Sequence, residues 1–154
     1  MPDEPLPLLN NRFTVNIDSS RPDCSRRNIA FSSISAMRSS RSTSIRSSLM
    51  LKLFDILRRN YTTNQIELRR ALDTDHFFFD WHRANLHRTL DLRTLTICQL
   101  DQRTGKPVNC WRLYDCWIHT WLGPGFDAVS SDITYETITL CYRSLNWLNN
   151  SHHT

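Results

Sequence analysis

The sequence has few glycines and no long apolar run. Three glycines in 154 residues leave few turns able to use positive φ angles, which favours helices over a fold built of many tight hairpins. No run of 18 apolar residues occurs, so the sequence predicts no membrane span. The first residues lack the basic and apolar regions of a secretory signal. These absences predict an intracellular protein, cytoplasmic or nuclear.

The motifs of common catalytic sites are also missing. The sequence contains no Gly-x-Ser-x-Gly, no Walker loop, no dinucleotide fingerprint and no His-Glu-x-x-His. A nucleophilic pair could be drawn from the five cysteines and six histidines, but nothing in the sequence selects one pair over another. The sequence therefore predicts a protein that is not an enzyme and has no catalytic residues.

The cysteines and histidines offer one alternative, a zinc site. Cys110, Cys116 and His119 lie within ten residues, and His82 and His87 could supply a second pair of ligands. Because a five-residue gap between cysteines is not a standard zinc-knuckle spacing, we expect free thiols, mostly buried in the core. An odd number of cysteines without a secretory signal agrees with free thiols. The sequence thus predicts no cofactor, with zinc as the alternative.

Arginine is greatly preferred over lysine. The chain has 17 arginines but only two lysines, Lys52 and Lys106. Arginine is favoured where a planar, bidentate contact with phosphate or carboxylate is needed. A coding region that overlaps another reading frame produces a similar skew, which is typical of small viral accessory proteins. The composition alone does not separate these two explanations.

Residues 1–48 are predicted to form a disordered, basic arm. They hold 12 serines between positions 19 and 48 and too little apolar surface to offset chain entropy. No acidic residue occurs between positions 24 and 54. Ser42 and Ser44 follow arginines as basophilic kinases prefer, so they are candidate phosphorylation sites. The basic residues that we assign to the arm are Arg26, Arg27, Arg38, Arg41 and Arg46.

Residues 49–154 are predicted to form a single compact α+β domain that is mainly helical. Apolar residues spaced three or four apart predict helices near 49–59, 63–72 and 75–90. A hairpin is expected over about 92–113, with Gly105 in its loop, followed by one or two further helices. An all-α bundle is the alternative fold.

Aromatic side chains are the candidate anchors for a partner, because aromatic residues and arginine dominate binding hot spots. The sequence predicts a regulatory or accessory interaction protein, viral and encoded in an overlapping frame, that binds host or viral proteins to counter host responses. The alternative is an RNA-binding protein that uses the basic arm with aromatic and arginine platforms. A protein partner is expected, RNA is the alternative partner, and the oligomeric state stays open. The candidate anchors are Trp117, Trp121, Phe77, Phe78 and Phe79.

Overall fold

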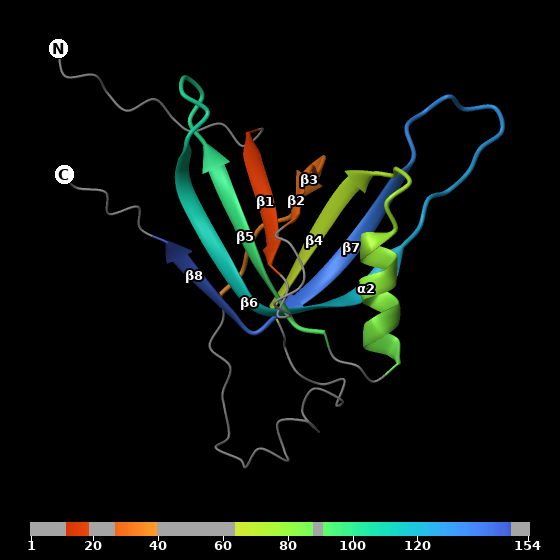
Figure 1. Ribbon diagram of the computed structural model, residues 1–154. Coiled ribbons are helices and arrows are strands. Elements are labelled where there is room, and N and C mark those ends of the chain that lie inside the picture. Colours follow the sequence, from red (N-terminus) through yellow and green to blue (C-terminus); the bar gives the residue numbers. More distant parts are fainter. Residues whose placement is uncertain (1–11, 19–26, 40–63, 88–90, 149–154) are drawn as a thin grey trace, which may run out of the picture.

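The computed structural model describes residues 12–18, 27–39, 64–87 and 91–148. Within these ranges the chain forms eight β-strands and one α-helix. The strands are paired in the order β2-β1-β5-β6-β7-β4-β3, with β8 paired to β6, and every pairing is antiparallel (Figure 1). The elements are β1 (Phe13–Asp18), β2 (Arg27–Ile29), β3 (Ser33–Ile34), β4 (Asn64–Ala71), α2 (Phe77–Leu86), β5 (Arg93–Leu100), β6 (Pro107–Leu122), β7 (Tyr135–Tyr142) and β8 (Ser144–Leu148).

β6 is a long, bent strand that belongs to both halves of the sheet. Its first half pairs with β5 and β8, and its second half pairs with β7. Tyr114 is opposite Ser144 and Trp117 is opposite Cys141, so β7 and β8 follow the same edge of β6 in one register. Asp115 lies at the change of partner with a φ of 53°, which is uncommon for a residue other than glycine. The strand therefore turns at Asp115 and connects the two halves.

Alternation of apolar and polar residues places the core on one face of each strand. In β4, Asn64, Ile66, Leu68 and Arg70 are buried while the residues between them are exposed. Side chains of a strand alternate between the two faces of a sheet, so this pattern defines a half-buried strand. Each fully buried Leu, Ile or Phe contributes about 1.5–3 kcal/mol. Residues from both halves form one core, which includes Val15, Ile17, Leu68, Leu95, Leu113, Ile118, Ile138 and Leu140.

The helix α2 packs against β6 through its aromatic residues. Phe78 and Trp81 are buried, and both belong to the core cluster. The indole Nε1 of Trp81 donates a hydrogen bond to the carbonyl oxygen of Asp91 at 2.8 Å. The guanidinium of Arg93 lies over the ring of Phe77, 4.9 Å from its centroid. These contacts connect the helix to the start of β5.

The predicted α+β domain of mainly helical content is wrong, and so is the all-α alternative. The described residues form one helix and an antiparallel sheet. The helix predicted over 63–72 is the strand β4, and the helices predicted after residue 113 are the rest of β6, β7 and β8. The hairpin over 92–113 is confirmed, with a φ of 66° at Gly105, and α2 lies within the helix predicted over 75–90. The helix predicted over 49–59 lies outside the described residues.

Part of the predicted disordered arm belongs to the sheet. β1, β2 and β3 all lie within residues 1–48, and β1 pairs with β5 along its whole length. Val15 and Ile17 are buried because they face the core, where Val15 is opposite Ile97. The prediction that these strands are disordered is therefore wrong. The predicted boundary after residue 48 lies outside the described residues.

Candidate functional site

A protruding loop between β6 and β7 exposes large apolar side chains. We call residues 123–134 the acidic loop, because they contain Asp127 and Asp132 and no lysine or arginine. Phe126 is 85% exposed, Val129 is 95% exposed and Ile133 is 66% exposed. In Figure 1 this loop extends beyond the end of the sheet. Apolar residues gathered on an exposed segment indicate an interaction site.

The roots of the acidic loop are fixed by hydrogen bonds and packing. The backbone amide of Leu72 donates to the carbonyl of Thr134 at 2.9 Å. At the other root, a Cβ atom on Gly123 would lie 2.6 Å from the Trp121 ring, so only glycine fits there without a shift. Trp121 in turn donates from its indole Nε1 to Oε2 of Glu136 at 2.7 Å. The loop therefore leaves the sheet in a defined direction.

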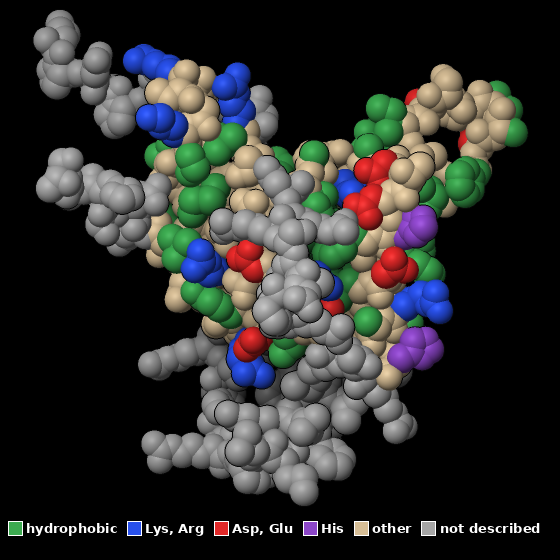
Figure 2. All heavy atoms as spheres, in the orientation of Figure 1, with side chains coloured by type: hydrophobic (Ala, Val, Ile, Leu, Met, Phe, Trp, Pro, Cys, Tyr) green, Lys and Arg blue, Asp and Glu red, His purple; other side chains and the backbone are tan. Residues whose placement is uncertain are grey.

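The turn between β5 and β6 presents a basic surface. We call Arg12 together with residues 101–106 the basic tip. Its basic side chains, Arg12, Arg103 and Lys106, are exposed. Nη1 of Arg12 donates a hydrogen bond to the carbonyl oxygen of Gln102 at 2.9 Å, which connects Arg12 to the turn. Asp101 is held in the turn, because hydrogen bonds from the amide and hydroxyl of Thr104 lower the pKa of its carboxyl. Figure 2 shows basic side chains at one upper corner of the molecule and the acidic loop at the other.

A buried ion pair joins β4 to β7 below the acidic loop. Arg70 and Glu136 are directly opposite in the register, and Nε of Arg70 donates to Oε1 of Glu136. Their side chains are only 5% and 3% exposed. Arg70 also donates from Nη2 to Oδ1 of Asp73 at 3.1 Å and to the carbonyl of Asp75 at 2.9 Å. Since Trp121 binds the second oxygen of Glu136, the network connects both sheet strands to the end of β6.

The candidate aromatic anchors lie around the contact between α2 and β6. Phe78 is fully buried and belongs to the core cluster. Phe77, Trp117 and Trp121 are partly buried, and Phe79 is 37% exposed with its ring 4.9 Å from that of Trp121. The rings of Phe77 and Phe78 contact each other, as do those of Phe79 and Trp121. Their role in binding a partner stays a prediction.

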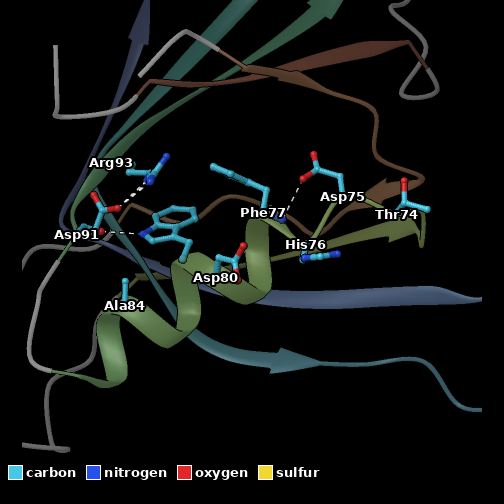
Figure 3. Close-up of a pocket in the computed structure, with 9 residues that line it drawn as sticks. Thr74, Asp75, His76, Phe77, Asp80, Ala84, Asp91 and Arg93 are labelled. Carbon is cyan, nitrogen blue, oxygen red and sulfur yellow. Dashed lines mark hydrogen bonds and ion pairs between the residues drawn. The ribbon is translucent and has the colours of Figure 1, made fainter. Parts of the chain in front are cut away.

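A cavity of about 390 Å³ opens beside α2. In Figure 3, Arg93 points to Asp91, and Asp80 and Ala84 lie on the helix. The Arg93 Nη2 atom is 2.7 Å from Oδ2 of Asp91, so the one cation of the lining is already paired. The remaining lining includes two further carboxylates, Asp75 and Asp80. The cavity is open to solvent, and acidic and aromatic side chains line it.

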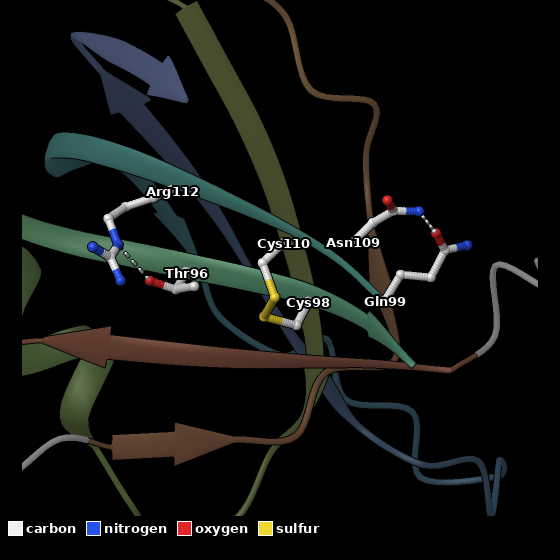
Figure 4. Close-up of a disulfide and its surroundings, with 6 residues drawn as sticks. All are labelled: Thr96, Cys98, Gln99, Asn109, Cys110 and Arg112. Atoms are coloured by element: carbon white, nitrogen blue, oxygen red, sulfur yellow. Dashed lines mark hydrogen bonds between the residues drawn. A yellow bond between two sulfur atoms is a disulfide. The ribbon is translucent and has the colours of Figure 1, made fainter. Parts of the chain in front are cut away.

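The candidate zinc ligands do not come together. Cys110 forms a disulfide with Cys98 on the neighbouring strand, with their Cα atoms 4.1 Å apart (Figure 4). Burial raises the pKa of the Cys116 thiol to about 12, which opposes metal binding by its thiolate. His119 is exposed and its Nδ1 lies 2.8 Å from the hydroxyl of Thr120. Among the described residues, no group of three or more His, Cys, Asp or Glu could hold a metal ion.

The disulfide also corrects the expectation of free thiols. Cys98 and Cys110 are directly opposite in the register of β5 and β6, which brings their Cβ atoms close enough to be bridged. Cys116 and Cys141 are buried, as expected for cysteines in a core. The remaining histidine candidates, His82 and His87, both lie at the C-terminal half of α2 or just after it.

The basic arm is only partly described. Arg27 is in β2, and Arg38 is exposed, with its backbone amide donating to the Tyr142 hydroxyl at 2.9 Å. The other candidates of the arm lie outside the described residues: Arg26, Arg41, Arg46, Ser42 and Ser44. Within the described part of the chain, no helix is long and apolar enough to cross a membrane.

The described residues thus define a protein of the antiparallel β class with one packed helix and with exposed apolar side chains on a projecting loop. The comparison with family models gives the particular family. The model of the T4-like virus tail tube protein gp19 matches residues 9–146. The chain therefore belongs to this family. A search of curated proteins finds no match.

Several solved structures have a similar fold. A chain of the anti-feeding prophage baseplate, described as six-fold symmetrised, is 18% identical with a TM-score of 0.71, over 96% of this chain and 99% of that one. A chain of the extracellular contractile injection system PVC, from its sheath/tube terminator, is 20% identical with a TM-score of 0.69, covering 97% and 100%. Hcp1 from Flavobacterium johnsoniae is 9% identical with a TM-score of 0.51, covering 87% and 94%.

The family corrects the function predicted from the sequence. A regulatory accessory protein that counters host responses is wrong, and so is the RNA-binding alternative, because the matched family consists of structural tail tube proteins. The compositional skew was interpreted as evidence of an overlapping frame, but the same composition is found here on a tube-type fold. The expectation of protein partners agrees with the family at that general level.

Proposed function

We propose that this chain is a structural subunit of the tube of a contractile injection particle and that it assembles with copies of itself. The match of residues 9–146 to the tail tube family carries this proposal. A further similar fold supports it: a chain of the PVC sheath-tube complex in its extended state is 19% identical with a TM-score of 0.66, over 92% of this chain and 91% of that one.

Exposed sheet edges support assembly between copies. β8 pairs with β6 along one edge, and its other edge has no partner strand among the described residues. Trp147 on this strand is 62% exposed, although its ring lies 5.6 Å from that of Trp111. An open edge with a large exposed aromatic residue is a surface on which another chain can pair. A tube built of many copies would cover such surfaces.

In this role the subunit forms part of the tube wall and catalyses no reaction. Its cohesion comes from the apolar core and the sheet ladders, and the chemistry of the role requires neither a metal nor an organic cofactor. The partners are further copies of this chain, with other proteins of the particle at the ends or outside of the tube.

The test is the assembly state of the purified full chain. Light scattering after size exclusion and negative-stain electron microscopy, over a range of protein concentrations, should show rings or tubes. Rings that never lengthen would indicate a terminating role, since one similar fold belongs to a sheath/tube terminator. A folded monomer at every concentration and salt would contradict the proposal.

A further inference from the structure

One strand connects the two charged surfaces of the molecule. The basic tip lies immediately before β6, and the acidic loop lies immediately after it. In Figure 1 the bent strand runs down from the first surface and up to the second, so that both lie at the same end of the molecule on opposite sides. Because β6 is hydrogen-bonded to β5, β7 and β8, the spacing between the two surfaces is set by the sheet.

The two surfaces differ in charge. Asp127 and Asp132 give the acidic loop a net charge of −2. Arg12, Arg103 and Lys106, less the carboxylate of Asp101, give the basic tip a net charge of +2. Both surfaces also expose apolar side chains, Phe126 and Val129 on the loop and Val108, 39% exposed, beside the tip. The acidic loop and the basic tip are thus opposite in charge, and both have exposed apolar side chains in or beside them.

We propose that the acidic loop of one copy docks on the basic tip of the next copy around a ring. The proposal rests on the proposed function, because it names the lateral contact of the assembly. Loop against loop and tip against tip would oppose like charges, which disfavours a symmetric dimer through either surface. A contact between two different surfaces of one chain is heterologous and closes into a ring when the rotation allows it. Phe126 and Val129 would then be covered by the neighbour.

Charge reversal tests this pairing directly. The loop variant D127K/D132K would face a basic tip with a basic loop, and the tip variant R103E/K106E would face an acidic loop with an acidic tip. Each variant alone should raise the protein concentration at which rings form by at least about tenfold at low salt, with a smaller effect at high salt. Ring formation is followed by light scattering and negative-stain microscopy.

Mixing the two variants is the decisive step. In the mixture, the reversed loop of one variant meets the reversed tip of the other, and the two unaltered surfaces meet as well. Rings should therefore return in the equimolar mixture, and also in the chain that carries all four substitutions. The control for the loop variant is Glu67→Lys with Asp80→Lys, which makes the same change in net charge at two exposed positions outside both surfaces. The control should form rings as the unaltered chain does.

The outcomes separate this inference from the proposed function. If the unaltered chain forms no rings, the proposed function fails. If it forms rings and both reversed variants do too, with unchanged concentration dependence, the loop-to-tip contact is refuted while the tube role stands. Loss of rings without recovery in the mixture also refutes the contact. Circular dichroism of each variant shows whether the subunit is folded, and Phe126→Ser, which leaves the charges unchanged, should weaken rings at both low and high salt.

Discussion

Replacing Glu136 by glutamine should destabilise the subunit strongly. The substitution keeps the shape of the side chain but removes the negative charge opposite Arg70, whose side chain is 5% exposed. It also places an amide group where Nε of Arg70 now donates to Oε1. A buried cation is then left with fewer partners, and its desolvation is no longer offset.

The magnitude follows from what Arg70 retains. Removing one partner of a buried pair typically costs about 3–5 kcal/mol. Arg70 keeps its bonds to Asp73 and to the carbonyl of Asp75, so we expect the lower end, about 3 kcal/mol. For a chain of this size that corresponds to a fall in the melting temperature of roughly 6–12 °C. The paired replacement Arg70→Met with Glu136→Leu removes both charges and should cost less than Glu136→Gln alone.

Denaturant unfolding and thermal melts, at one fixed protein concentration because assembly stabilises the fold, measure these differences. The matched control is Glu67→Gln, which makes the same chemical change at an exposed position on β4 and should shift stability by less than about 0.5 kcal/mol. A cost below about 1 kcal/mol for Glu136→Gln, or a paired replacement costlier than the single one, would refute the role assigned to this ion pair.

Two further predictions concern the cysteines. Without reductant, the denatured chain should react with a thiol reagent at two or more cysteines fewer than the fully reduced chain does, because Cys98 and Cys110 are bridged. Reaction at all five cysteines without reductant would contradict the bridge. Replacing both bridged cysteines by serine should lower the free energy of unfolding by about 2–3 kcal/mol. Burial raises the pKa of Cys116 from 9.0 to about 12, so the folded state favours the neutral thiol. The contribution of this group to the free energy of unfolding is complete below pH 9. It is lost as the pH rises towards 12, by up to about 1.4 kcal/mol per pH unit. The free energy of unfolding should therefore fall less between pH 8 and pH 10.5 for Cys116→Ala than for the unaltered chain. An equal fall in both proteins would contradict the raised pKa of Cys116.

Local signals in the sequence were sufficient for α2 and for the hairpin of β5 and β6. Gly105 adopts a φ of 66°, as the turn requires, and β-branched residues of β5 indicate a strand. The aromatic run of α2 supplies the buried residues Phe78 and Trp81 at a helical spacing of three. In both cases the pattern is contained in one element and does not depend on distant partners.

The helix predicted for the segment of β4 rests on the presence of apolar residues there and not on the spacing between them. Ile66, Leu68 and the buried Arg70 alternate strictly with exposed residues, which is the period of a strand. The arginine hides this alternation, because a charged residue is rarely expected in the core. Its partner Glu136 is on β7, 66 residues later, so the sequence alone does not show that the charge is paired.

The second half of β6 was predicted as a helix for a different reason. Buried residues at Leu113, Cys116 and Ile118 are spaced three and two apart, because the strand bends at Asp115. A register shift between Ile118 and Thr120 changes the phase again. A strand with irregularities imitates a helical period, since each bulge moves the inward face by one residue.

The anchors predicted from the sequence are tryptophans and phenylalanines, and they do not include the surfaces proposed here for assembly. Trp117 and Trp121 are both partly buried, and the ring of Trp121 packs against that of Phe79 within the subunit. The available signal was the set of large apolar residues that follows the Gly123-Pro124-Gly125 break, where no periodic pattern could bury them. Apolar residues in a segment that cannot form a core face are better candidates for a partner surface than aromatic residues within a strand.

The position of the buried ion pair gives it a consequence beyond stability. Glu136 accepts from Arg70 with one oxygen and from Trp121 with the other, and Trp121 lies against Gly123 at the root of the acidic loop. The same carboxylate thus connects β4 to the point where the chain leaves β6. Since the opposite end of β6 starts at the basic tip, the core determines the distance and direction between the two proposed contact surfaces. A ring closes only when that relation is the same in every copy, so a rigid, fully paired network at this point favours assembly without contacting any neighbour.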